Sequence, residues 1–176
     1  IGLGSGLVIW LDIGAFLGGM LVGYIWGWAA DRYGSKPVML FGVCLWMVFP
    51  LMCLFMPRGE LAVYAGAAAT FIMGMANIAW VIGYNRYLNV SAVPIQKKTA
   101  YMAVFYACIG LGCGIGPLLG GSLLKACSGL NGRFLIFNIN QFTPLWLGSI
   151  AIFILGVMIL SKVRADGAMP MRKFVG

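Results

Sequence analysis

Few side chains in this sequence could do acid–base chemistry, and one of them lies inside an apolar run. The sequence has no His and only four carboxylates, Asp12, Asp31, Glu60 and Asp166. Asp12 is the only one of these within a long apolar stretch, where a buried carboxyl could take up and release a proton. Alternatively, Asp12 lies near the outer water interface, because the first helix starts late. Asp12 is therefore one candidate for ion coupling.

A second group of polar and aromatic residues follows a helical spacing. Thr70, Asn77 and Tyr84 are seven positions apart, so they share one face of a helix, and Trp80 lies beside Asn77 on it. An amide and aromatic rings that face a central cavity could bind a neutral or sugar-like solute. The alternative is that they serve as contacts between helices and as an interfacial aromatic belt. Tyr101, in the next apolar segment, has a similar status with weaker support.

Composition places these residues in a membrane. Of 176 residues, 62% are hydrophobic and 9% are charged, against about 45–50% and 25% in soluble domains. A bilayer span takes about 20 apolar residues, and an open sheet cannot satisfy its backbone in lipid. The sequence therefore predicts an all-α, polytopic transmembrane bundle. Five spans are expected, at about residues 6–30, 37–56, 61–84, 101–124 and 142–160, followed by a tail at 161–176. The apolar run Phe134 to Ile139 is expected to be an interfacial turn or an early start of the fifth helix.

The basic residues predict the orientation of the bundle. They punctuate the apolar segments rather than forming a patch, which argues against nucleic-acid binding despite the net charge of +8. One side would hold nine of the 12 Lys and Arg residues and the other side three. The positive-inside rule puts the richer side, and with it the C-terminus, in the cytoplasm. The richer side holds Arg32, Lys36, Arg86, Lys97, Lys98, Lys162, Arg164, Arg172 and Lys173; the other holds Arg58, Lys125 and Arg133.

Glycines mark the first helix and the turn after it. Gly19, Gly23 and Gly27 are four residues apart, so another backbone could approach their common face, either statically or as a sliding contact. In the turn, Asp31 could accept hydrogen bonds from the N-terminus of the next helix. Gly34 permits a tight turn.

The segment from Gly27 to Lys36 resembles the signature loop of the major facilitator superfamily, roughly G-x-L-A-D-R-x-G-R-K. Ala29 stands where Leu is usual, and Ser35 replaces the first basic residue. The resemblance implies a cytoplasmic latch that holds one conformation against the other. The alternative is an ordinary charged turn. The residues that the resemblance assigns to the latch are Gly27, Asp31, Arg32, Gly34 and Lys36.

A second string in the fourth apolar segment fits G-x-x-x-G-P-x-x-G-G. Pro117 removes a backbone hydrogen bond and is expected to bend the helix, while the glycines would let it pack tightly. Similar strings occur in the fifth helix of drug antiporters and in the eleventh helix of other members of the superfamily. The motif residues are Gly112, Gly116, Pro117, Gly120 and Gly121.

The resemblance covers essentially the whole chain and favours helices eight to twelve of the family. In an N-terminal half, the third span should carry an Arg in a pattern like R-x-x-Q-G, and alignment on Gly74 puts Thr70 there. Pro94 to Gly121 also resembles uncharacterised bacterial members. Helices two to six remain the alternative. The apolar start at Ile1 leads us to expect a fragment whose N-terminal half is missing.

These features predict a secondary transporter that moves a small solute by alternating access. The resemblance implies a monomer in the bacterial cytoplasmic membrane. A proton or cation could drive it, with no cofactor or metal, and the sequence has no nucleotide-binding loop G-x-x-x-x-G-K-[ST]. A non-transporting scaffold or sensor of the same fold is the alternative. A membrane enzyme is disfavoured because clustered acids, bases and metal ligands are absent from the sequence.

Overall fold

The computed structural model describes residues 5–56, 61–92, 97–130, 132–134 and 137–163, and these form a helical bundle with one short β-hairpin. Its five long helices are α1 (Ser5–Tyr33), α2 (Ser35–Leu54), α3 (Leu61–Arg86), α4 (Lys98–Ala126) and α5 (Thr143–Lys162). Each predicted span overlaps one of these helices, and the predicted and observed ends differ by at most three residues. All five are long and apolar enough to cross a membrane. The turn at 57–60 and most of the predicted tail (164–176) lie outside the described residues.

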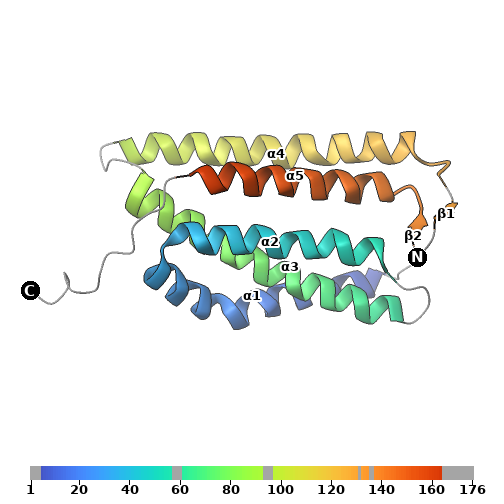
Figure 1. Ribbon diagram of the computed structural model, residues 1–176, viewed down its shortest axis with the longest axis horizontal. Coiled ribbons are helices and arrows are strands. Elements are labelled where there is room, and N and C mark those ends of the chain that lie inside the picture. Colours follow the sequence, from blue (N-terminus) through green and yellow to red (C-terminus); the bar gives the residue numbers. More distant parts are fainter. Residues whose placement is uncertain (1–4, 57–60, 93–96, 131, 135–136, 164–176) are drawn as a thin grey trace, which may run out of the picture.

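Consecutive helices run in opposite directions along the long axis of the molecule, so α1, α3 and α5 are parallel to one another (Figure 1). One end holds the turn between α1 and α2, the end of α3 with its π-helical continuation η1 (Tyr87–Ala92), and the last turn of α5. The opposite end holds the last turns of α2 and α4 and the first turns of α3 and α5. The described basic residues at the first end are Arg32, Lys36, Arg86, Lys97, Lys98 and Lys162; those at the opposite end are Lys125 and Arg133.

The connection between α4 and α5 forms a short β-hairpin. Strands β1 (Gly132–Phe134) and β2 (Phe137–Ile139) pair antiparallel, with Gly132 opposite Ile139. The apolar run Phe134 to Ile139 is therefore not an early start of the fifth helix, because its described residues belong to the two strands. Helix α5 begins later, at Thr143, with Pro144 in its first turn, where the missing N–H of proline costs nothing.

Helix α3 forms its main contacts with α1 and α2, and small residues allow the close approach. A Cβ on Gly74 would collide with the backbone of Ala15 in α1. A Cβ on Gly42 of α2 would lie 3.0 Å from the Trp80 amide nitrogen in α3. The predicted glycine face of α1 is only partly used, because Gly19 meets Ile78 closely whereas Gly27 has nothing within 4 Å. The close α1–α3 contact therefore lies toward the middle of α1.

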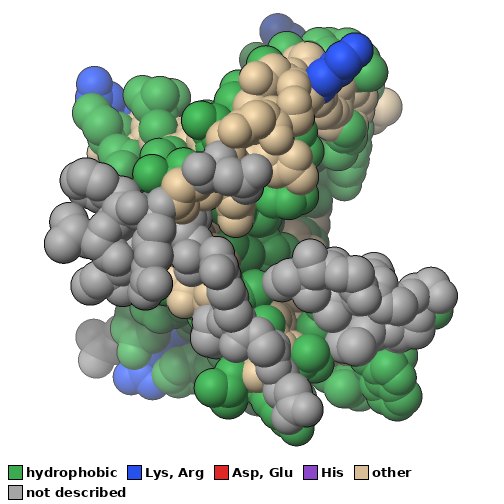
Figure 2. All heavy atoms as spheres, turned by 90° about the vertical axis from the view of Figure 1, so that its right-hand side faces the viewer, with side chains coloured by type: hydrophobic (Ala, Val, Ile, Leu, Met, Phe, Trp, Pro, Cys, Tyr) green, Lys and Arg blue, Asp and Glu red, His purple; other side chains and the backbone are tan. Residues whose placement is uncertain are grey.

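The surface of the bundle is apolar. Large side chains point outward along the helices, including Phe16 and Met20 at 80% exposure and Tyr24 at 86%. Hydrophobic side chains cover most of the coloured surface at the end shown in Figure 2, where Lys and Arg appear at few points. Such a surface is stable against lipid rather than water. The chain is an integral membrane protein.

Helix α4 lies beside α5 but has few contacts with the rest of the described chain (Figure 1). None of its residues is buried. The helix continues through Pro117 from Lys98 to Ala126. The predicted tight packing of its glycine motif does not occur within the described residues. Gly112, Gly116 and Gly121 have nothing within 4 Å of an added Cβ, and Gly120 meets only Leu145, at 3.7 Å.

Candidate functional site

The turn between α1 and α2 is joined to the end of α3 by an ion pair. Arg86, in the last turn of α3, donates from Nε to Oδ1 of Asp31 over 3.1 Å. Its Nη1 donates to Ser35 Oγ at 3.2 Å. The Arg86 side chain is 18% exposed and that of Asp31 is 76% exposed. One guanidinium thus bridges both sides of the turn, in the fork geometry that suits arginine.

The same turn also reaches α5. Lys36 donates from Nζ to the backbone carbonyl of Ser161 at 2.6 Å. The last carbonyls of a helix lack partners within the helix, and a cation there also opposes the negative end of the helix dipole. We call Asp31, Ser35, Lys36, Arg86 and Ser161 the loop cluster. It ties together the ends of α1, α2, α3 and α5.

The predicted latch residues lie in different surroundings, and only some of their expected roles are found. Gly34 has φ 90°, so the prediction of a tight turn at a glycine is confirmed. Asp31 was expected to accept from the N-terminus of α2, but that helix begins without a side-chain cap and Asp31 pairs with Arg86. Arg32 lies over the rings of Trp28 and Tyr33, with its guanidinium carbon 5.2 and 5.8 Å from their centroids. Gly27 faces open space.

Sequence reasoning did not identify Arg86 or Ser161 as partners of this loop. Arg86 carried one available signal, because it is a basic residue in the last turn of a helix that ends on the same side as the loop. Ser161 acts through its backbone carbonyl, so its side-chain type carried no signal.

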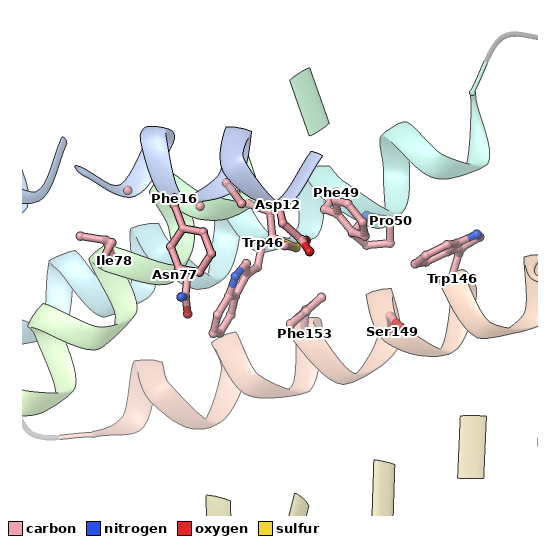
Figure 3. A pocket seen from close by; sticks show the side chains of 14 residues that line it. Asp12, Phe16, Trp46, Phe49, Pro50, Asn77, Ile78, Trp146, Ser149 and Phe153 are labelled. Carbon is pink, nitrogen blue, oxygen red and sulfur yellow. The ribbon is translucent and has the colours of Figure 1, made fainter. Parts of the chain in front are cut away.

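A cavity of about 620 Å³ lies between α1, α2, α3 and α5 (Figure 3). Asp12 and Phe16 approach it from α1, whereas Phe153 and Ser149 approach it from the facing helix α5. Its polar side chains are a carboxylate, an amide and a hydroxyl, and none of its lining residues is Lys or Arg. The lining consists of Asp12, Ala15, Phe16, Gly19, Trp46, Phe49, Pro50, Met73, Gly74, Asn77, Ile78, Trp146, Ser149 and Phe153.

The structure brings together two of the predicted solute or ion candidates, Asp12 and Asn77, which 65 positions separate in the sequence. Sequence reasoning missed Ser149, which lines the same cavity while its Oγ donates to the Leu145 carbonyl at 2.9 Å. A serine within an apolar span was the only signal for it. It also missed Pro50, a buried proline inside α2 that lines the cavity beside Trp46.

Aromatic rings line the cavity and continue beyond it. Trp46 stacks on Phe153 of α5 at 6.0 Å between centroids, with an interplanar angle of 29°. Phe49 of α2 meets Trp146 of α5 edge-on, at 5.7 Å and 76°. Trp46 also contacts Trp80 of α3, at 6.0 Å between centroids. These ring pairs join α2 to both α5 and α3.

The other candidates lie outside the cavity lining. Thr70 donates to the Gly66 and Ala67 carbonyls of its own helix and lies against Gly14 of α1. Trp80 and Tyr84 contact each other, at 6.0 Å between centroids, and Tyr84 reaches Phe105 of α4 at 5.0 Å. Tyr101 is 54% exposed on α4.

Comparison with known proteins agrees with this arrangement. The family model described as the Major Facilitator Superfamily matches residues 1–169. A "Proton-coupled folate transporter" of Rattus norvegicus is 26% identical over 70% of this chain and 27% of its own length. A "Probable peptide/nitrate transporter" of Arabidopsis thaliana is 25% identical over 82% of this chain and 28% of its own.

A third relative, the "MFS-type transporter TwmF" of Talaromyces wortmannii, is 24% identical over 68% of this chain and 21% of its own length. The chain thus spans about a quarter of the length of these curated relatives. No solved structure matches it significantly. The family model covers nearly the whole chain, and five apolar helices with a charged turn after the first are in keeping with it. This chain belongs to the major facilitator superfamily of membrane transporters.

Proposed function

We propose that this chain is part of a secondary transporter that moves a small solute across the bilayer by alternating access. The carrying observation is the loop cluster, in which Arg86 holds Asp31 and Ser35 while Lys36 holds the Ser161 carbonyl. These polar contacts connect four helix ends at one end of the bundle. Contacts of this kind can hold one end closed and break when the helices move.

In this proposal the loop cluster lies on the cytoplasmic side, together with the C-terminus, in a bacterial cytoplasmic membrane. Six of the described Lys and Arg residues lie at that end, which supports the orientation. The chain supplies helices eight to twelve of a monomeric transporter, and the rest of the parent protein supplies the remaining helices. Asp12 and Asn77 line the solute site, and Asp12 is available to a coupling proton or cation.

The names of the relatives suggest which solutes to test first. The panel of test solutes takes folate, peptides and nitrate from these names and adds sugars, amino acids and cationic drugs. The full-length parent protein in proteoliposomes would be given each solute with an imposed pH gradient. Uptake of labelled solute and the internal pH would be measured together, so that flux with and without proton coupling is seen.

The matched variants are Asp31→Asn and Lys162→Gln. Asp31→Asn removes the charge that Arg86 holds, whereas Lys162→Gln removes a charge from the exposed last turn of α5. The proposal predicts uptake of at least one solute that falls several-fold in Asp31→Asn and stays near wild type in Lys162→Gln. Absence of any uptake across the panel would favour a non-transporting scaffold or sensor of the same fold.

A further inference from the structure

We infer that the cavity between α1, α2, α3 and α5 binds a monovalent organic cation with an apolar or aromatic body. The inference rests on the proposed function, because it takes this cavity as the solute site and names the chemical class of the solute. Four features of the lining carry it: a single carboxylate, a set of aromatic rings, a proline-freed carbonyl, and neutral polar groups with no basic residue.

The carboxylate is Asp12, whose side chain extends toward the space between Trp46 and Phe49 (Figure 3). Within the described part of the chain, no hydrogen bond or ion pair engages it. The Asp12 side chain is exposed at the cavity, so its negative charge is accessible to a cation that enters there and attracts it. An anionic solute would meet the same charge with no Lys or Arg among the lining residues to offset it.

Aromatic rings form much of the remaining wall. Trp46 and Phe153 stack at 6.0 Å, and Phe49 and Trp146 meet edge-on at 5.7 Å. These pairs link α2 and α5, and Phe16 adds a ring from α1. The faces of such rings attract cations, and quaternary ammonium groups are commonly bound in this way. The rings also bury the apolar body of a cation that bulk water solvates poorly.

Pro50 adds a third feature. Proline inside a helix has no N–H for the carbonyl four residues earlier, and here that carbonyl belongs to Trp46. Both residues line the cavity. The Trp46 carbonyl therefore lacks its usual helical donor.

The neutral polar groups limit how the cation lies. The Asn77 amide approaches from α3 and is exposed, and the Ser149 hydroxyl approaches from α5 (Figure 3). Ser149 already donates its proton to Leu145, so its oxygen remains an acceptor. A hydroxyl or amide substituent on the cation could bond to these two groups while its charge lies near Asp12.

Binding to the purified full-length parent protein tests the inference. The probes are benzyltrimethylammonium, the neutral benzyl alcohol and the anion phenylacetate, measured by isothermal titration calorimetry. The cation should bind at least tenfold more tightly than the other two. Asp12→Asn should weaken cation binding by roughly tenfold or more, and Asp12→Glu should retain most of it. Equal binding of the three probes, or no loss in Asp12→Asn, would overturn the inference.

The aromatic wall has a matched pair of variants. Trp46→Leu should weaken cation binding several-fold. Tyr64→Leu changes an aromatic residue of α3 that is 73% exposed and absent from the cavity lining, and it should leave the affinity unchanged. Size-exclusion profiles identical to wild type exclude misfolding as the cause of a loss. An equal loss in both variants would contradict a role for the rings.

Access to the cavity in the whole protein provides an independent measurement. Ser149→Cys, in a parent protein from which the native cysteines, including the five of this chain, have been removed, should react with the cationic thiol reagent MTSET and be protected by benzyltrimethylammonium. No reaction would mean that another part of the parent protein fills the cavity, which overturns the inference.

Failure of the inference is distinguishable from failure of the proposed function. If the protein transports a neutral or anionic solute and binds no organic cation, the function stands and the inference fails. If the cation binds through Asp12 without any flux, the site stands and the proposed transport fails.

Discussion

Arg86 in the last turn of α3 donates from Nε to Oδ1 of Asp31 over 3.1 Å, although 55 positions separate the two residues. The pair joins the turn after α1 to the end of α3, and the same guanidinium also reaches Ser35. Because the Asp31 side chain is 76% exposed, water screens the attraction and the pair adds little to stability. We propose that the pair instead favours one conformation of the protein over the other.

We expect the Asp31–Arg86 pair to affect transport more than stability. In a double-mutant cycle of Asp31→Asn and Arg86→Gln, the coupling in the free energy of unfolding should be about 0.2–1 kcal/mol. Solute uptake by the parent protein should fall several-fold in each single variant, and little further in the double variant. Additive losses of uptake would mean that the two residues act separately.

Lys36→Gln should loosen the last turn of α5 without unfolding the bundle. The substitution removes the charged donor to the Ser161 carbonyl, and a hydrogen bond from a charged group is worth about 1.5–3 kcal/mol where it is sheltered, less at an exposed site such as this. Hydrogen exchange should become faster for amides in the last turn of α5 and stay unchanged in its first turn. Lys36→Arg, which keeps a donor, serves as control. Uniformly faster exchange along α5 would contradict a local capping role.

Gly74→Ala should destabilise the contact between α1 and α3. The added methyl would collide with the backbone of Ala15, so the helices must separate. Overpacking of this kind costs about 1–3 kcal/mol, and more where backbone must move. Thermal unfolding of the purified protein measures the loss. Gly112→Ala in α4 is the control, because an added Cβ there has nothing within 4 Å. Equal effects at both positions would argue against a close α1–α3 contact.

Gly34→Ala should destabilise the turn between α1 and α2. Gly34 has φ 90°, a conformation that costs a residue with a Cβ about 1 kcal/mol or more. Gly148→Ala changes a glycine inside α5 that has open space around it and should be neutral or slightly stabilising. The measurement is the midpoint of thermal unfolding, compared between the two variants and the wild type. A harmless Gly34→Ala would show that the turn can adopt another backbone conformation.

The sequence by itself determined the five helices and where they end. Long apolar runs must be helical in lipid, and the breaks between them carry charged residues, glycine and proline, so both signals are local. The turn at Gly34 was predictable for the same reason, because the need for a positive φ falls on one residue. The hairpin of Gly132–Phe134 and Phe137–Ile139 was not, since strands this short have too few residues to show an alternating pattern.

Only the tertiary structure decided which residues meet. Asp12, Asn77 and Ser149 line one cavity, although their own segments carry no signal for one another. The partner of Asp31 proved to be Arg86 rather than the start of α2, and Gly19 packs closely while Gly27 does not. Such contacts depend on how each helix is rotated and where it crosses its neighbours. Packing of the whole bundle sets that geometry, and a pattern along one helix does not.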